Sequence, residues 1–100
     1  MQNREVDQLL GLANRARKIV TGEFVIKSIQ NKTAKLVLIA EDASDNTKKR
    51  LTDKCAFYQI DYRIYSDSDN LSYAIGKSNR VAIAVTDEGF AKSLLKKLGG

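Results

Sequence analysis

Residues 36–42 read Leu-Val-Leu-Ile-Ala-Glu-Asp, a short apolar run that changes abruptly to two carboxylates. A continuously apolar segment of this length, rich in branched side chains, is typical of a β-strand that is covered on both faces. Residues 81–85, Val-Ala-Ile-Ala-Val, repeat the pattern towards the other end of the chain. The two runs therefore predict central strands of one sheet with helices on both sides of it.

Segments with helical spacing of apolar residues separate the expected strands. Helices are expected over residues 4–16, from Thr21 or Gly22 to about Lys32, from Ser44 or Asp45 through Tyr58, from residues 66–69 through Ile75, and from residues 86–88 through Leu98. Residues 18–20 and 62–65 are expected to be shorter extended pieces. Helices that alternate with strands in this way favour an α/β domain with a mainly parallel sheet.

The composition describes one folded domain, residues 1–100, with an excess of positive charge. The chain is 43% hydrophobic, and its 17 Lys and Arg residues against 12 Asp and Glu residues give a net charge of +5. Such an excess favours a polyanionic partner, with nucleic acid first among the possibilities. Because mild basicity also serves solubility alone, charge by itself leaves the partner open.

Several classes of function lack the residues that they need. The chain has no histidine, its lone cysteine is Cys55, and it carries no Gly-rich phosphate loop, nucleophile elbow or paired-cysteine motif. We therefore expect a protein that is not an enzyme and that has no cofactor, metal or small-molecule substrate. We also expect it to be a monomer. The lack of an apolar leader, of an apolar run of about 20 residues and of a disulfide partner leads us to expect a cytoplasmic protein with no membrane partner.

Three polar segments lie where α/β sheets bind ligands, which is beyond strand ends and at the start of the following helices. They are residues 20–24, 40–43 and 76–80, and the last segment joins the others only if the strand directions allow it. Backbone N–H groups, Lys27 near the positive end of a helix dipole, and Lys18 are candidates for binding a phosphate. The segment before the last strand offers further donors to phosphates and base edges.

Each candidate also has an ordinary explanation. Lys27 is equally compatible with a solvated helix face, and residues 77–80 with a plain polar loop. Phe24, in the first turn of its helix, either packs inward or offers a stacking face to an unpaired base. Glu41 and its acidic neighbours are explained by helix capping without a cation, so no metal site is expected.

The order of these pieces resembles the ribosomal protein L-seven-Ae family, which includes the L-thirty-e proteins and binds kink-turn RNA. Residues 21–27 (Thr-Gly-Glu-Phe-Val-Ile-Lys), 34–43 (Ala-Lys-Leu-Val-Leu-Ile-Ala-Glu-Asp-Ala) and 71–85 carry the resemblance, which covers nearly the whole chain. Residues 9–13 (Leu-Leu-Gly-Leu-Ala) and 85–90 (Val-Thr-Asp-Glu-Gly-Phe) are most similar to the bacterial YlxQ-type branch. The most specific piece is Ala-Glu-Asp after the apolar strand.

The resemblance implies a three-layer α/β/α sandwich around a four-stranded mixed sheet, so not every strand pair is expected to be parallel. It implies non-catalytic binding of structured RNA, in association with ribosomes or with another structured RNA, at the three polar segments named above. The residues expected to contact RNA are Lys18, Thr21, Gly22, Glu23, Phe24, Lys27, Glu41, Asp42, Lys77, Ser78, Asn79 and Arg80.

The family's helix motif reads Gly-Thr-Asn-Glu-x-x-Lys, and its Asn, Glu and Lys contact the sheared G·A pairs of the RNA. Lys27 matches the motif lysine, and Gly22 approximates its glycine. Aligned on that lysine, Glu23 replaces Asn, Phe24 replaces Glu, and the segment is one residue shorter. A carboxylate cannot donate as an amide does, and a phenyl ring cannot accept from a guanine edge. General RNA binding is therefore expected to survive better than kink-turn specificity, and the alternative is a protein-interaction module that kept the fold and lost the RNA site.

Overall fold

The computed structural model describes residues 3–99. Over these residues the chain forms nine elements in the order α1 (Arg4–Arg15), β1 (Ile19–Thr21), α2 (Glu23–Gln30), β2 (Leu36–Ile39), α3 (Asp45–Tyr58), β3 (Tyr62–Ile64), α4 (Ser68–Ala74), β4 (Ala82–Val85) and α5 (Glu88–Lys97). Each expected helix and strand is present, although most end one or two residues earlier than the pattern indicated. None of the described helices is both long enough and apolar enough to span a bilayer.

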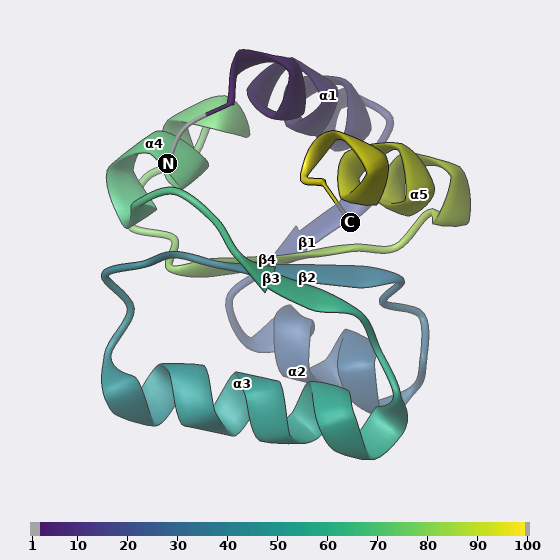
Figure 1. The fold of residues 1–100 in the computed structure, drawn as a ribbon, viewed down its shortest axis with the longest axis vertical. Helices are drawn as coiled ribbons and strands as arrows, with labels where there is room; N and C mark the ends of the chain where they lie inside the picture. The colour runs from purple at the N-terminus through teal and green to yellow at the C-terminus, as the bar shows by residue number, and fades with distance from the viewer. Residues whose placement is uncertain (1–2, 100) are drawn as a thin grey trace.

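The elements form three layers, as expected from the resemblance. A four-stranded sheet in the order β1-β4-β2-β3 lies between α1, α4 and α5 on one face and α2 and α3 on the other (Figure 1). Side chains of β2 alternate between the two faces: Leu36 and Leu38 pack towards the first helix layer, and Val37 and Ile39 towards the second. All four residues are fully buried, which explains why their segment is apolar without interruption.

The sheet is mixed, and the expectation of a mainly parallel sheet was wrong. Strand β2 is parallel to β3, but β4 is antiparallel to both β1 and β2. Strand β4 lies between β1 and β2 and runs in the opposite direction to both. A continuous apolar run indicates that a strand is covered on both faces, but it does not indicate the direction of the strand. The direction depends on the edge of the sheet at which the preceding connection ends. The family resemblance predicted a mixed sheet correctly, whereas the periodicity of apolar residues did not.

Side-chain caps begin four of the five described helices. Asn3, Ser44, Asp67 and Asp87 each accept a hydrogen bond from a backbone N–H in the first turn of the helix that follows. Helix α2 is the exception, because its cap is Gly22 and no side chain accepts from its first turn. The helix start that lacks a side-chain cap is the one that the sequence singled out as an anion site.

Candidate nucleic-acid interface

The register of the sheet brings residues 20–24, 40–43 and 76–80 together at one edge of the sheet, the near edge. Thr21, the last residue of β1, pairs with Ile83, and Ile39, the last residue of β2, pairs with Ala82. The ends of β1 and β2 therefore lie beside the start of β4. Because residues 76–80 lead into β4, they join the start of α2 and residues 40–43 at this edge. The strand directions thus meet the condition that the sequence left open.

Arg80 ties the segment before β4 to the end of β1. Its Nε donates to Thr21 Oγ1 at 3.2 Å, and its Nη1 donates to the carbonyl of Ser78 at 3.1 Å. The buried hydroxyl of Ser72 donates to the Arg80 carbonyl at 3.1 Å and accepts from the Arg80 N–H at 2.8 Å. Arg80 therefore holds its own loop in place, and the residue is only half-buried at the edge.

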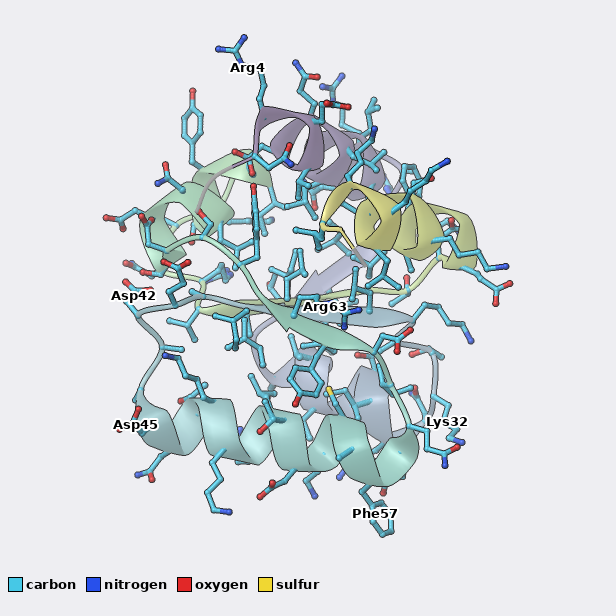
Figure 2. The ribbon with its side chains drawn as sticks, viewed as in Figure 1. Arg4, Lys32, Asp42, Asp45, Phe57 and Arg63 are labelled. Atoms are coloured by element: carbon cyan, nitrogen blue, oxygen red, sulfur yellow. The ribbon has the colours of Figure 1, made fainter. Side chains whose placement is uncertain are left out.

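Asp42 anchors the segment after β2 to the start of α4. Its carboxylate accepts from the Ser68 N–H and from the Ser68 hydroxyl, both at 2.8 Å. These two donors hold the pKa of Asp42 below its ordinary value. In addition, the Glu41 N–H donates to the Ser66 carbonyl at 2.7 Å. Figure 2 shows Asp42 at this edge of the molecule and Lys32, which follows α2, at the opposite edge.

The start of α2 presents two sequence-predicted side chains to solvent. Gly22 has φ 62° and ψ −139°, a conformation that favours glycine, and Val25 turns inward. Phe24 is 56% exposed and Lys27 is exposed, so the inward-packing explanation of Phe24 is excluded. Three residues apart on one helix, their side chains lie on neighbouring parts of its surface. Glu23 is exposed beside them.

A hollow of about 260 Å³ lies between α2, α3 and the segment before β4. Its lining residues from α2 and its cap are Gly22, Val25 and Ile26; those from α3 are Thr47, Arg50 and Leu51; and those from the remaining segment are Asn79, Arg80, Val81 and Ala82. The residues of α3 were not among the expected site residues. Thr47 and Leu51 are four residues apart, with the exposed Arg50 between them, so the three residues lie on one face of α3. This spacing is the feature of the sequence that could have indicated them as site residues.

The structure does not bring Lys18 to this group. The Lys18 carbonyl accepts from the N–H and the hydroxyl of Thr86, at 2.8 and 3.2 Å, which places it where β1 begins and β4 ends. That is the far edge of the sheet, about 10 Å from Thr21 at the strand rise of about 3.3 Å per residue. Lys77 and Ser78, in contrast, are exposed in the segment at the near edge.

The near edge carries more positive than negative side chains. Lys27, Arg50 and Lys77 are exposed there and Arg80 is half-buried, against the carboxylates of Glu23, Glu41 and Asp42. No three His, Cys, Asp or Glu residues gather closely enough to hold a metal ion anywhere in residues 3–99. The arrangement of cations, amide N–H groups, an exposed ring and a hollow suits an anion with planar groups attached.

The chain is a small α/β/α domain in which three polar segments meet at one edge of the sheet. The chain belongs to the Ribosomal protein L7Ae/L30e/S12e/Gadd45 family, whose model matches residues 4–95. It is 54% identical over 99 residues to "RNA-binding protein YlxQ" of Bacillus subtilis (strain 168), covering 98% of this chain and 99% of that protein. It is 40% identical over 94 residues to "RNA-binding protein YlxQ" of Enterococcus faecium, covering 92% and 89%. Membership of this family confirms that the chain is not an enzyme.

Solved structures share the whole architecture. A protein of unknown function from Bacillus halodurans superposes with a TM-score of 0.93 and 42% identity, covering 98% of this chain and 100% of that one. A Giardia lamblia 15.5kD RNA binding protein gives a TM-score of 0.79 at 19% identity, covering 99% and 89%. At that identity the second likeness supports the fold alone. The three-layer fold expected from the resemblance is confirmed.

Proposed function

We propose that this chain is a non-catalytic RNA-binding protein and that its site is the near edge, formed by the start of α2 with residues 40–43 and 76–80. The observation that carries the proposal is the convergence of these segments beside an exposed Phe24 and an exposed Lys27. The names of the two curated relatives, both called RNA-binding proteins, support it.

Phosphate groups are the first chemical partner of this edge. Lys27, Arg50 and Lys77 each offer a charged donor, and the start of α2 offers backbone N–H groups without a competing side-chain cap. Each phosphate neutralised releases counterions, so affinity falls as salt rises. With about four or five phosphate contacts, affinity should fall by about one to three orders of magnitude between about 50 and 200 mM salt.

Unpaired bases are the second partner. The exposed face of Phe24 suits stacking on a base that has left its helix, and the hollow beside α2 offers Arg50 and Asn79 as donors around apolar Ile26. Both features need an RNA whose bases are displaced from a duplex. The proposed target is therefore structured RNA with displaced bases, a class that includes kink-turn-like and ribosomal RNA. The proposed place of binding is the cytoplasm, with the protein as a monomer.

The reading of sheared G·A pairs is weakened in this chain. Glu23 is a carboxylate at the position of the motif amide, and Phe24 has no acceptor for a guanine edge. We infer that preference for a kink-turn over a control stem-loop is small. The same two residues are the observation that favours the second candidate function, a module that binds protein and no RNA.

A gel-shift series separates the two candidates. A kink-turn RNA and a plain duplex of equal length are titrated with the wild type, with Lys27→Ala and with Lys96→Ala, which removes an exposed lysine from α5 on the other face of the sheet. We expect salt-sensitive binding that Lys27→Ala weakens by about 1–3 kcal/mol and Lys96→Ala leaves unchanged. No binding at low salt, or equal affinities for the two variants, would overturn the proposal.

The double variant Glu23→Asn with Phe24→Glu tests the reading of the kink-turn itself. It restores an amide donor and a carboxylate acceptor while one carboxylate leaves and another arrives, so local charge is unchanged. We expect its preference for the kink-turn over the stem-loop to rise by about 1–2 kcal/mol. Strong kink-turn preference in the wild type would refute the inference of weakened reading. A double variant without any gain would assign the loss to the shortened segment before α2.

A further inference from the structure

A second groove lies away from the near edge, between α1 and α4 on the sheet face opposite to α2. It has a volume of about 730 Å³, within the range of about 300–1,000 Å³ that is usual for ligand sites. Its lining residues are Arg4, Asp7, Gln8, Gly11, Leu12 and Arg15 from α1 and Tyr73 and Ala74 from α4. None of them takes part in the site described above.

One face of α1 forms a wall with a cation at each end. Arg4, Gln8 and Arg15 share this face because intervals of four, seven and eleven residues are close to whole helical turns, and Leu12 lies at the edge of the face. At about 1.5 Å per residue, the two arginines are about 16 Å apart along the helix. Both arginines are exposed, and neither forms an ion pair with another residue of the range 3–99. Asp7 also lines the groove, and its Oδ1 already accepts from the Tyr65 hydroxyl at 2.7 Å.

The groove is also lined by an aromatic ring. Tyr73 is 85% exposed and Leu12 is 51% exposed, values that leave most of both side chains in contact with water. A cationic trough with an accessible aromatic ring is the usual arrangement for single-stranded nucleic acid, in which a base stacks on the ring and phosphates follow the charges. An amphipathic protein helix would need a continuous apolar stripe, and Gln8 with the two arginines interrupts it here.

The groove begins where the near edge ends. The Tyr73 carbonyl accepts from the Gly76 N–H at 3.0 Å, and the Ser72 carbonyl accepts from the Lys77 N–H at 2.9 Å. The helix that carries Tyr73 therefore leads directly into the segment that we assign to RNA binding. A strand that leaves a bound RNA past Lys77 meets Tyr73 within one helical turn.

We propose that the groove between α1 and α4 binds a single-stranded extension of the same RNA, with a base stacked on Tyr73 and phosphates at Arg4 and Arg15. This inference rests on the proposed function, since the structured part of the RNA delivers the extension. It adds a requirement that the near edge does not impose, namely unpaired nucleotides next to the structured element.

The test compares three RNAs that share one structured core: a blunt form, a form with about six unpaired nucleotides at the 5′ end, and the same extension at the 3′ end. Fluorescence anisotropy measures Kd for each RNA. We expect one of the extended forms to bind the wild type at least about fivefold more tightly than the blunt form. Tyr73→Ala and Arg15→Gln should each remove most of that gain without changing the affinity for blunt RNA.

Two matched variants serve as controls. Phe57→Ala removes an aromatic ring that is 79% exposed on α3, on the opposite face of the molecule from Arg4 (Figure 2). Lys96→Gln removes one charge from α5. Both should retain the full gain from the extension. Because Tyr73 is almost fully exposed, its replacement should leave thermal unfolding by circular dichroism unchanged, so a loss of the gain is not a loss of the fold.

The outcomes separate this inference from the proposed function. Equal binding of blunt and extended RNAs, or a gain that survives Tyr73→Ala, would overturn the groove while leaving the near edge intact. Failure of the wild type to bind blunt RNA would overturn the proposed function instead. Sedimentation of the free protein adds a third outcome: a dimer that Tyr73→Ala dissociates would assign the groove to a second copy of this chain and refute the inference.

Discussion

Replacing Ser72 with alanine removes the contact that fastens the segment before β4 to α4. The Ser72 side chain is 2% exposed, and its hydroxyl makes two hydrogen bonds to the backbone of Arg80, at 2.8 and 3.1 Å. Each bond contributes about 0.5–1.5 kcal/mol, so their loss costs about 1–3 kcal/mol of unfolding free energy. The better helix propensity of alanine offsets about 0.5 kcal/mol. The net loss is therefore about 0.5–2.5 kcal/mol, or about 2–20 °C in Tm for a domain of this size.

The same substitution should also weaken RNA binding, because residues 78–80 would have to be ordered when the RNA binds. Ordering costs about 0.5–1.5 kcal/mol for each side chain that is immobilised, which corresponds to about a two- to twelvefold rise in Kd for each such side chain. Urea unfolding followed by far-UV circular dichroism measures the first effect, and RNA anisotropy measures the second. Ser93→Ala on α5 is the control, since its side chain is exposed, and it should stay within about 0.5 kcal/mol of the wild type. A Ser72→Ala variant as stable as Ser93→Ala, with unchanged RNA affinity, would refute this reasoning.

Three further predictions concern single residues. Gly22→Ala should cost about 1–3 kcal/mol of stability, measured by urea unfolding, because φ is 62° and ψ is −139° there; an unchanged midpoint would contradict the strain. The hydrogen bonds from Ser68 lower the pKa of Asp42 below its ordinary value of 3.8, so the Asp42→Asn variant should be less stable than the wild type at pH 7. This difference in unfolding free energy should shrink as the pH falls through the folded-state pKa of Asp42. A difference that does not change with pH would count against the anchoring role of Asp42. Burial raises the pKa of Cys55 to about 11, so Ellman's reagent at about pH 8 should react slowly with the native protein and quickly in denaturant; equal rates would disprove its burial.

The elements were predictable from the sequence because burial and capping leave local signals. The two apolar runs form β2 and β4, whose residues are all buried. The sequence offered Ser44 or Asp45 as the cap of the next helix, and Ser44 caps α3. Strand direction leaves no such signal. Strand β4 runs antiparallel to its neighbours, although its residues resemble those of β2, because direction depends on how α4 returns the chain to the sheet.

Features of the candidate site that depend on a single segment could be predicted from the sequence. Contacts between segments that are far apart in the sequence could not. The exposure of Lys27 in α2 agrees with its expected place on the helix surface. Arg80 and Thr21 are 59 residues apart in sequence, so their hydrogen bond follows only from the register of β1 on β4. The same register removes Lys18 from the group, since its carbonyl bonds at the far edge. Arg50 enters the hollow only because α3 packs beside α2.

The central claim is that one edge of the sheet binds RNA, and backbone amide shifts from NMR test it most directly. ¹⁵N-labelled protein is titrated with a blunt kink-turn RNA at low salt. The account predicts that the largest shift changes fall on residues 22–27, 40–43 and 76–80, while the amides of Lys18 and of α5 remain nearly unchanged. Changes concentrated on α5 and the far edge, or no changes at saturating RNA, would contradict it.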